Sequence, residues 1–85
     1  MTTVTLNEAE MALLFKQDPS TKNDGGWQRL IVSLQEVTDR KTGELAIPAK
    51  LLSRIGSYAF DHGEGGYENR LREIFGRTLG AGLGR

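Results

Sequence analysis

The chain has 85 residues, no cysteine, and 11 basic against 11 acidic residues, which gives a formal net charge of zero. This length fits a single domain, and the lack of cysteine excludes disulfides and thiolate metal sites. Zero net charge disfavours a general nucleic-acid binder, which usually carries a basic excess, and it equally disfavours an acidic mimic of DNA.

The N-terminal segment MTTVTLNEAE lacks the basic and apolar regions of a signal peptide. The longest unbroken apolar run, residues 11–15, is far too short to cross a bilayer. We therefore predict a cytoplasmic protein that has no membrane partner.

The first predicted helix begins at Thr5. The stretch TLNE, residues 5–8, fits a capping box in which the Thr5 hydroxyl accepts from the Glu8 amide and the Glu8 side chain reaches back. The helix ends before Pro19, because proline disfavours helical backbone in the residue that precedes it. Apolar side chains on two sides of this helix leave both a monomer and a homodimer open.

A polar loop of turn-forming residues, DPSTKNDGG at 18–26, precedes the clearest amphipathic pattern in the chain. The pattern predicts a second helix that begins with Asp24 as its N-cap and ends near Asp39. Its apolar stripe consists of Trp27, Leu30, Ile31, Leu34 and Val37.

Residues 39–44 have the composition of a turn, in which Asp39 accepts from backbone amides and Gly43 takes a positive φ. Residues 45–47 are apolar but have no obvious strand to pair with, so we predict an extended linker that packs on the core. Pro48 suits the first turn of a third helix, in which Gly56 permits a close helix crossing.

The loop DHGEGG, residues 61–66, precedes a fourth helix that begins at Tyr67 and loosens before Gly80. Three glycines fall within residues 80–85, and this tail is expected to be flexible. Leu79 and Leu83 offer apolar contacts through which the tail can still dock on the body.

One signature occurs twice at an offset of forty positions, as DGGW at 24–27 and EGGY at 64–67. In each copy the acid can cap a helix, the glycines permit close approaches, and the aromatic residue anchors the first turn. Either a tandem duplication or independent use of the same turn chemistry would explain this repeat.

The predicted fold is all-α, a compact four-helix single domain over residues 1–85 made of two helix–loop–helix units. The predicted core consists of Leu13, Leu14, Trp27, Ile31, Leu34, Leu51, Leu52, Ile55, Tyr58, Tyr67, Leu71, Ile74 and Phe75.

The sequence offers no strong chemical constellation. His62 is the only histidine, and its neighbour Asp61 seldom gives triad geometry from an adjacent position. Asp61, His62 and Glu64 form a weak metal pattern, since no second histidine or any cysteine completes it. The glycine-rich stretches at 63–66 and 80–84 do not follow a strand of a βαβ unit. We therefore predict a protein that is not an enzyme and has no catalytic, metal or cofactor-binding residues.

Basic residues gather on the third and fourth predicted helices. Glu68 precedes Arg72 by four residues, the favourable order for a pair on a helix. Glu73 and Arg77 have the same spacing. The remaining basic residues, together with one polar neighbour, form the predicted partner-binding set: Lys50, Arg54, Asn69 and Arg70.

Residues 48–77 also resemble a helix–turn–helix, in which Asn69 and Arg70 could read bases. The turn is acidic and longer than the usual three or four residues, and Glu68 would repel phosphate. A small nucleic-acid-binding transcriptional regulator is therefore the alternative function.

The segment YAFDHGEGGYENRL at 58–71, followed by IFGRTLG at 74–80, resembles small uncharacterised bacterial proteins associated with phages and plasmids. The resemblance extends over residues 13–85. Small, neutral proteins of mobile elements that lack enzymatic motifs include anti-CRISPRs. The resemblance implies a non-enzymatic inhibitor that binds a protein partner, such as a CRISPR–Cas effector subunit, and occludes it. It supplies no binding residues to transfer, and the zero net charge departs from the acidic mimicry that small anti-CRISPRs often use.

Overall fold

A two-stranded antiparallel sheet joins the first residues of the chain to the segment that follows the second helix. A computed structural model describes residues 1–63 and 65–85. In it, β1 (Thr2–Thr5) pairs with β2 (Glu44–Ile47), with Thr2 opposite Ile47 and Thr5 opposite Glu44. The prediction of an all-α fold was therefore wrong. Residues 45–47 are a paired strand because the β-branched segment TTVT, to which we had assigned no strand, supplies the missing partner.

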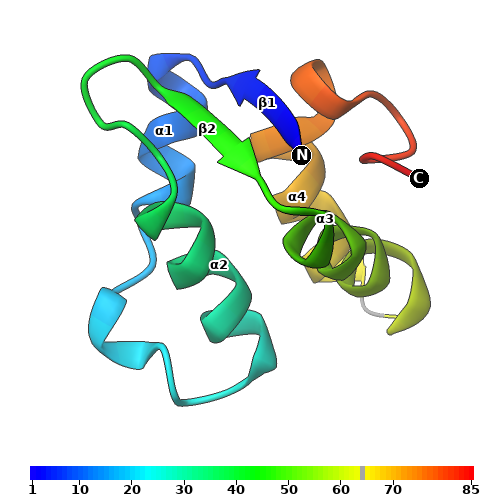
Figure 1. Cartoon of the computed structure of the whole chain (residues 1–85). Coiled ribbons are helices and arrows are strands. Elements are labelled where there is room, and N and C mark those ends of the chain that lie inside the picture. The colour runs from blue at the N-terminus through cyan, green and yellow to red at the C-terminus, as the bar shows by residue number, and fades with distance from the viewer. Residues whose placement is uncertain (64) are drawn as a thin grey trace.

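The described residues also form four α-helices: α1 (Glu8–Leu14), α2 (Gly26–Glu36), α3 (Ala49–Gly56) and α4 (Gly65–Leu79). A 3₁₀ turn, η1 (Pro19–Thr21), precedes α2, and a π-helical turn, η2 (Ser57–Asp61), continues α3. In Figure 1, α1 and the sheet occupy the upper part of the view, and α2 and α3 the lower part. Helix α4 packs against α1 and β1, and α2 packs against α1 and α3.

The start of α1 differs from the prediction. The N-cap is Asn7, whose side chain accepts from the Glu10 amide at 2.8 Å, while the Glu10 carboxylate accepts from the Asn7 amide at 2.9 Å. A capping box is present, but it lies two residues later than predicted, because Thr5 is the last residue of β1. The helix also ends earlier, at Leu14, and the Asp18 side chain caps η1.

The other boundaries are closer to the predictions. Helix α2 has Gly25 as its N-cap and no side-chain cap, so the predicted cap by Asp24 was wrong. Pro48 is the N-cap of α3, one position before its first turn. The turn after α2 is as predicted, since the Asp39 side chain accepts from the Lys41 amide at 2.8 Å and Gly43 has a φ of +79°.

Most of the predicted core is buried, and the sheet adds further residues. Leu13 is the clear exception, since 38% of it is exposed. Leu51, Leu52, Tyr58 and Tyr67 are partly buried at the edge of the core. Buried residues that the predicted core lacked are Leu6, Leu30, Val32, Leu45, Ile47, Ala59 and Leu83.

The C-terminal residues pack against α3 and η2. Leu83 is 0% exposed, and Arg85 forms an ion pair with Asp61 and lies 5.5 Å from the centre of the Phe60 ring. A Cβ on Gly56 would lie 2.8 Å from Arg85 Nε. The close approach expected at Gly56 is therefore made by the tail that we expected to be flexible.

No helix among the described residues combines the length and the apolar character that crossing a membrane requires.

Candidate partner-binding surface

Four aromatic side chains from three segments pack together and are here called the aromatic cluster: Trp27 of α2, Tyr58 of η2, His62 after η2, and Tyr67 of α4. The rings of Trp27 and Tyr67 stack, with centroids 4.6 Å apart, and those of Tyr58 and His62 stack at 4.3 Å. Tyr58 meets Trp27 edge-on at 6.0 Å and Tyr67 edge-on at 5.6 Å. The cluster therefore joins the first turns of α2 and α4, where the two Gly-Gly-aromatic signatures lie.

The two glycine pairs differ in how closely other side chains approach them. A Cβ on Gly26 would lie 1.9 Å from the Tyr58 hydroxyl oxygen, so only glycine admits the tyrosine in its present position. Nothing lies within 4 Å of a Cβ built on Gly65 or on Gly66. The repeated sequence thus has one packed copy and one open copy, and Glu64 of the second copy lies outside the described residues.

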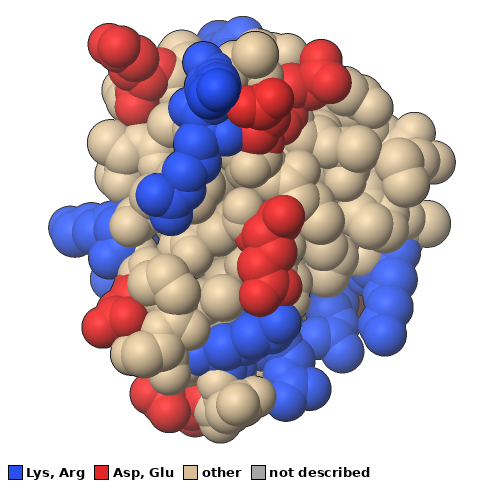
Figure 2. Space-filling view, turned by 60° about the vertical axis from the view of Figure 1, so that its left-hand side comes forward, with Lys and Arg blue, Asp and Glu red and all other residues tan. Residues whose placement is uncertain are grey.

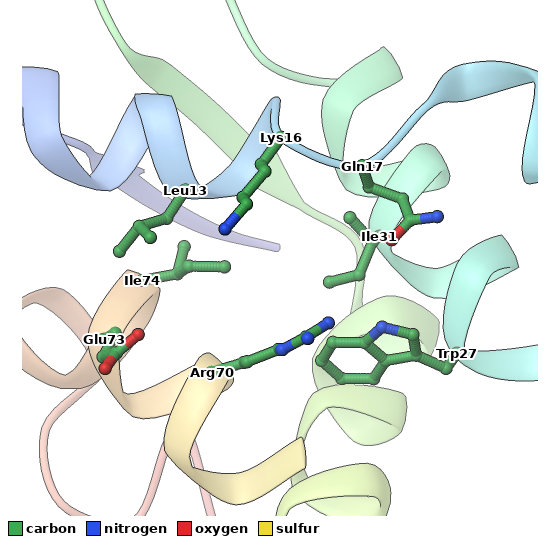
Figure 3. Close-up of a pocket in the computed structure, with 8 residues that line it drawn as sticks. All are labelled: Leu13, Lys16, Gln17, Trp27, Ile31, Arg70, Glu73 and Ile74. Atoms are coloured by element: carbon green, nitrogen blue, oxygen red, sulfur yellow. The ribbon is translucent and has the colours of Figure 1, made fainter. Parts of the chain in front are cut away.

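A pocket of about 330 Å³ lies between α1, α2 and α4, and we call it the α1–α4 pocket. Figure 3 shows Arg70 extending from α4 toward Trp27, and Lys16 extending from the end of α1 toward α4. The apolar lining of the α1–α4 pocket comes from all three of these helices. The lining residues are Leu13, Lys16, Gln17, Trp27, Ile31, Arg70, Glu73 and Ile74.

A buried glutamine fixes the segment that carries Lys16. The Gln35 side-chain amide donates to the carbonyl oxygens of Leu14 and Gln17, both at 2.9 Å. Leu14 is the last residue of α1, so the first of these bonds satisfies a carbonyl that the helix end leaves unpaired. The two bonds hold residues 14–17 against α2 and thereby fix the side of the α1–α4 pocket that Lys16 and Gln17 form.

A second hollow, of about 510 Å³, lies between the start of α2 and the α3–η2 segment, and we call it the α2–α3 pocket. Arg29 donates to the Asn23 side-chain oxygen at 3.2 Å, and Arg54 lines the opposite side. His62 Nδ1 lies 3.1 Å from the Ser57 carbonyl oxygen. Because a carbonyl oxygen only accepts, this hydrogen bond requires a proton on Nδ1.

The predicted partner-binding residues do not converge on one pocket. Arg70 lines the α1–α4 pocket and Arg54 lines the α2–α3 pocket, with the aromatic cluster between them. Lys50 and Asn69 are exposed and line neither pocket. The prediction missed Lys16 and Arg29, because no spacing along the sequence brings either residue to α3 or α4.

The ion pairs show which basic side chains are already paired with a carboxylate of this chain. Arg72 pairs with Glu68 at 2.8 Å, as predicted from their spacing. The predicted pair of Glu73 with Arg77 was wrong, because Arg77 reaches α1 and pairs with the buried Glu10 at 2.8 Å. No carboxylate in the described part of the chain forms an ion pair with the side chains that face the two pockets, namely Lys16, Arg29, Arg54 and Arg70.

Residues 1–63 and 65–85 contain no group of three or more histidine, cysteine, aspartate or glutamate side chains arranged to hold a metal ion. The surface is thus characterised by aromatic rings and by arginine and lysine side chains that have no carboxylate partner among the described residues. No protein-family model, curated protein or solved structure matches this chain.

Proposed function

We propose that this chain is a non-enzymatic inhibitor from a mobile genetic element, which works in the cytoplasm by binding and occluding a protein partner. The chain resembles small phage- and plasmid-associated proteins, and because small proteins of mobile elements include anti-CRISPRs, a CRISPR–Cas effector subunit is the specific partner that we propose. One observation supports the binding function: Arg54 and Arg70 line hollows on the two sides of the aromatic cluster. Arginine and aromatic residues are the types enriched at the centres of protein interfaces.

The charges of this surface favour a partner with acidic residues. A guanidinium binds a carboxylate through two parallel hydrogen bonds, which gives both energy and orientation. A partner carboxylate that meets Arg54 or Arg70 has no described carboxylate of this chain to displace. Binding at both hollows would cover the aromatic cluster and exclude water from it.

The alternative is a small nucleic-acid-binding regulator, in which the same arginines contact phosphates. Figure 2 shows acidic and basic side chains interspersed over one face, with Lys and Arg gathered most closely at its lower right. The chain as a whole has 11 basic and 11 acidic residues, and interspersed acids weaken a path for a phosphate backbone, so we favour the protein partner.

A pull-down from host lysate with tagged protein, with and without nuclease, tests the proposal. We expect an effector subunit to be retained after nuclease treatment and to be lost from the Arg54→Glu and Arg70→Glu variants. Lys41→Glu, in the turn between α2 and β2, is the matched control because it reverses an exposed charge away from both pockets.

Two results would contradict the proposal. Equal retention by the wild type and both arginine variants would remove this surface as the contact. Partners that disappear with nuclease, together with DNA or RNA binding that weakens steeply as salt rises, would favour the regulator.

A further inference from the structure

The α1–α4 pocket exposes an apolar surface that the chain itself leaves uncovered. Leu13 is 38% exposed on its rim, although its neighbour Leu14 is fully buried in the core. The floor is formed by side chains that are almost fully buried, namely Trp27, Ile31 and Ile74. Covering such a surface with another apolar side chain is favourable because it removes apolar area from water.

Two cations face this apolar floor from opposite sides. Figure 3 shows the Lys16 amine directed from the end of α1 toward α4, and the Arg70 guanidinium directed from α4 toward Trp27. Glu73, three residues after Arg70 on α4, is the one acidic residue of the lining among residues 1–63 and 65–85. The lining therefore carries two positive charges against one negative charge, which favours an occupant with a carboxylate.

The volume limits the size of the occupant. At about 330 Å³, the pocket lies at the small end of the range for ligand sites, roughly 300–1,000 Å³. It suits one large side chain and part of its neighbour. Leu13, Lys16 and Arg70 are all exposed along the rim, so a chain that continues past the pocket on both sides meets no obstacle from them.

We propose that the α1–α4 pocket binds a segment of a protein partner in which a large apolar side chain stands beside an acidic one. The apolar side chain enters between Leu13, Trp27 and Ile31, and the carboxylate pairs with Lys16 and Arg70. This inference rests on the proposed function and adds to it the chemistry of the partner.

The single tryptophan of the chain, Trp27, lies in this pocket and reports its occupancy by fluorescence. The probe is the acetylated, amidated peptide Ser-Asp-Phe-Ser, which contains neither tryptophan nor tyrosine. We expect a saturable change in fluorescence with a Kd on the order of 1 mM, since a short free peptide makes few contacts. The peptides Ser-Asn-Phe-Ser and Ser-Asp-Ala-Ser, which each lack one of the two groups, should bind about tenfold more weakly.

Variants locate the site. Lys16→Gln and Arg70→Gln should each weaken binding of the acidic peptide about tenfold and leave binding of the asparagine peptide unchanged. Arg72→Gln is the matched control, because it removes a charge of the same sign from α4 outside the pocket and should leave binding unchanged. All three side chains are exposed, so the variants should fold, and circular dichroism checks this.

The proposal is overturned if the peptide gives no saturable change, if the asparagine peptide binds equally well, or if Lys16→Gln and Arg70→Gln bind like the wild type. A response to free phenylacetate with none to the peptide would also overturn it, in favour of a small carboxylate. Failure of the proposed function looks different. A partner retained equally by the Lys16→Gln/Arg70→Gln double variant would keep the binding function and reject this pocket. Specific peptide binding without any retained host protein would keep this pocket as a binding site and reject the proposed function.

Discussion

The rings of Trp27 and Tyr67 stack with their planes inclined by only 10°, although forty positions separate the two residues. They are the aromatic residues of the two Gly-Gly-aromatic signatures, so the two copies of the repeated sequence pattern are in contact in the fold. The stack joins the first turns of α2 and α4, and Trp27 also lines the α1–α4 pocket. Stability and the geometry of this pocket are therefore linked through one pair of rings.

Replacing Tyr67 with alanine should destabilise the fold by about 1–3 kcal/mol, because it removes a half-buried ring and its stacking on Trp27. Tyr67→Phe is the control, since it keeps the ring and should stay within about 0.5 kcal/mol of the wild type. Urea unfolding followed by Trp27 fluorescence measures both values. Equal stability of the alanine variant and the wild type would show that the stack contributes nothing.

Alanine at Gly26 and at Gly66 should have opposite effects. At Gly26 the new Cβ would meet the Tyr58 hydroxyl, whose ring is held by Trp27 and His62, so we expect a loss of about 1–3 kcal/mol. At Gly66 the Cβ meets nothing within 4 Å, so alanine in the helix should stabilise by about 0.4–1 kcal/mol. Thermal unfolding of the two variants tests this, and a loss at both positions would contradict the distinction.

Helical spacing and turn chemistry predicted the local elements of this chain well. The predicted stripe is buried along α2 from Trp27 to Leu34, whereas its last residue, Val37, follows the helix and is 37% exposed. The Asp39–Gly43 turn has the hydrogen bonds that its composition indicates. These features depend on residues within one or two turns of one another, so the sequence contains their causes.

Long-range pairing could not be read from the sequence. The strand β2 needs β1, which lies about forty residues earlier and has only four residues with a β-branched bias. The same limit applies to the candidate surface. Arg70 was found because no local acid explained it, whereas Lys16 joins it only through the packing of α1 on α4.

The ion pair between Glu10 and Arg77 should make stability depend on pH. Hydrogen bonds from Arg77 hold the pKa of the buried Glu10 carboxyl below its usual 4.5, the Asn7 amide adds to this, and burial opposes it. A carboxyl with a lowered folded-state pKa stabilises the fold above its unfolded-state pKa. That stabilisation is lost as the pH falls through the folded-state value.

Glu10→Gln should therefore be less stable than the wild type at neutral pH, and the difference should shrink as the pH falls below 4.5. Glu8→Gln is the matched control, because Glu8 lies in the same first turn of α1 but is exposed and forms no ion pair with a described residue. Urea unfolding at several pH values measures the difference. A difference that does not shrink as the pH falls from neutral until the wild type itself unfolds would show that the charge of Glu10 is not its cause.

Leu83 anchors the C-terminal residues, and its replacement tests whether they are part of the fold. Its side chain is 0% exposed although its φ of +49° is unfavourable for a residue other than glycine. Alanine keeps this backbone cost and removes most of the buried side chain, so we expect Leu83→Ala to lose about 2–5 kcal/mol. Leu79→Ala, at a partly buried position four residues earlier, should lose less. If chemical denaturation finds Leu83→Ala as stable as the wild type, the tail does not contribute to the stability of the core.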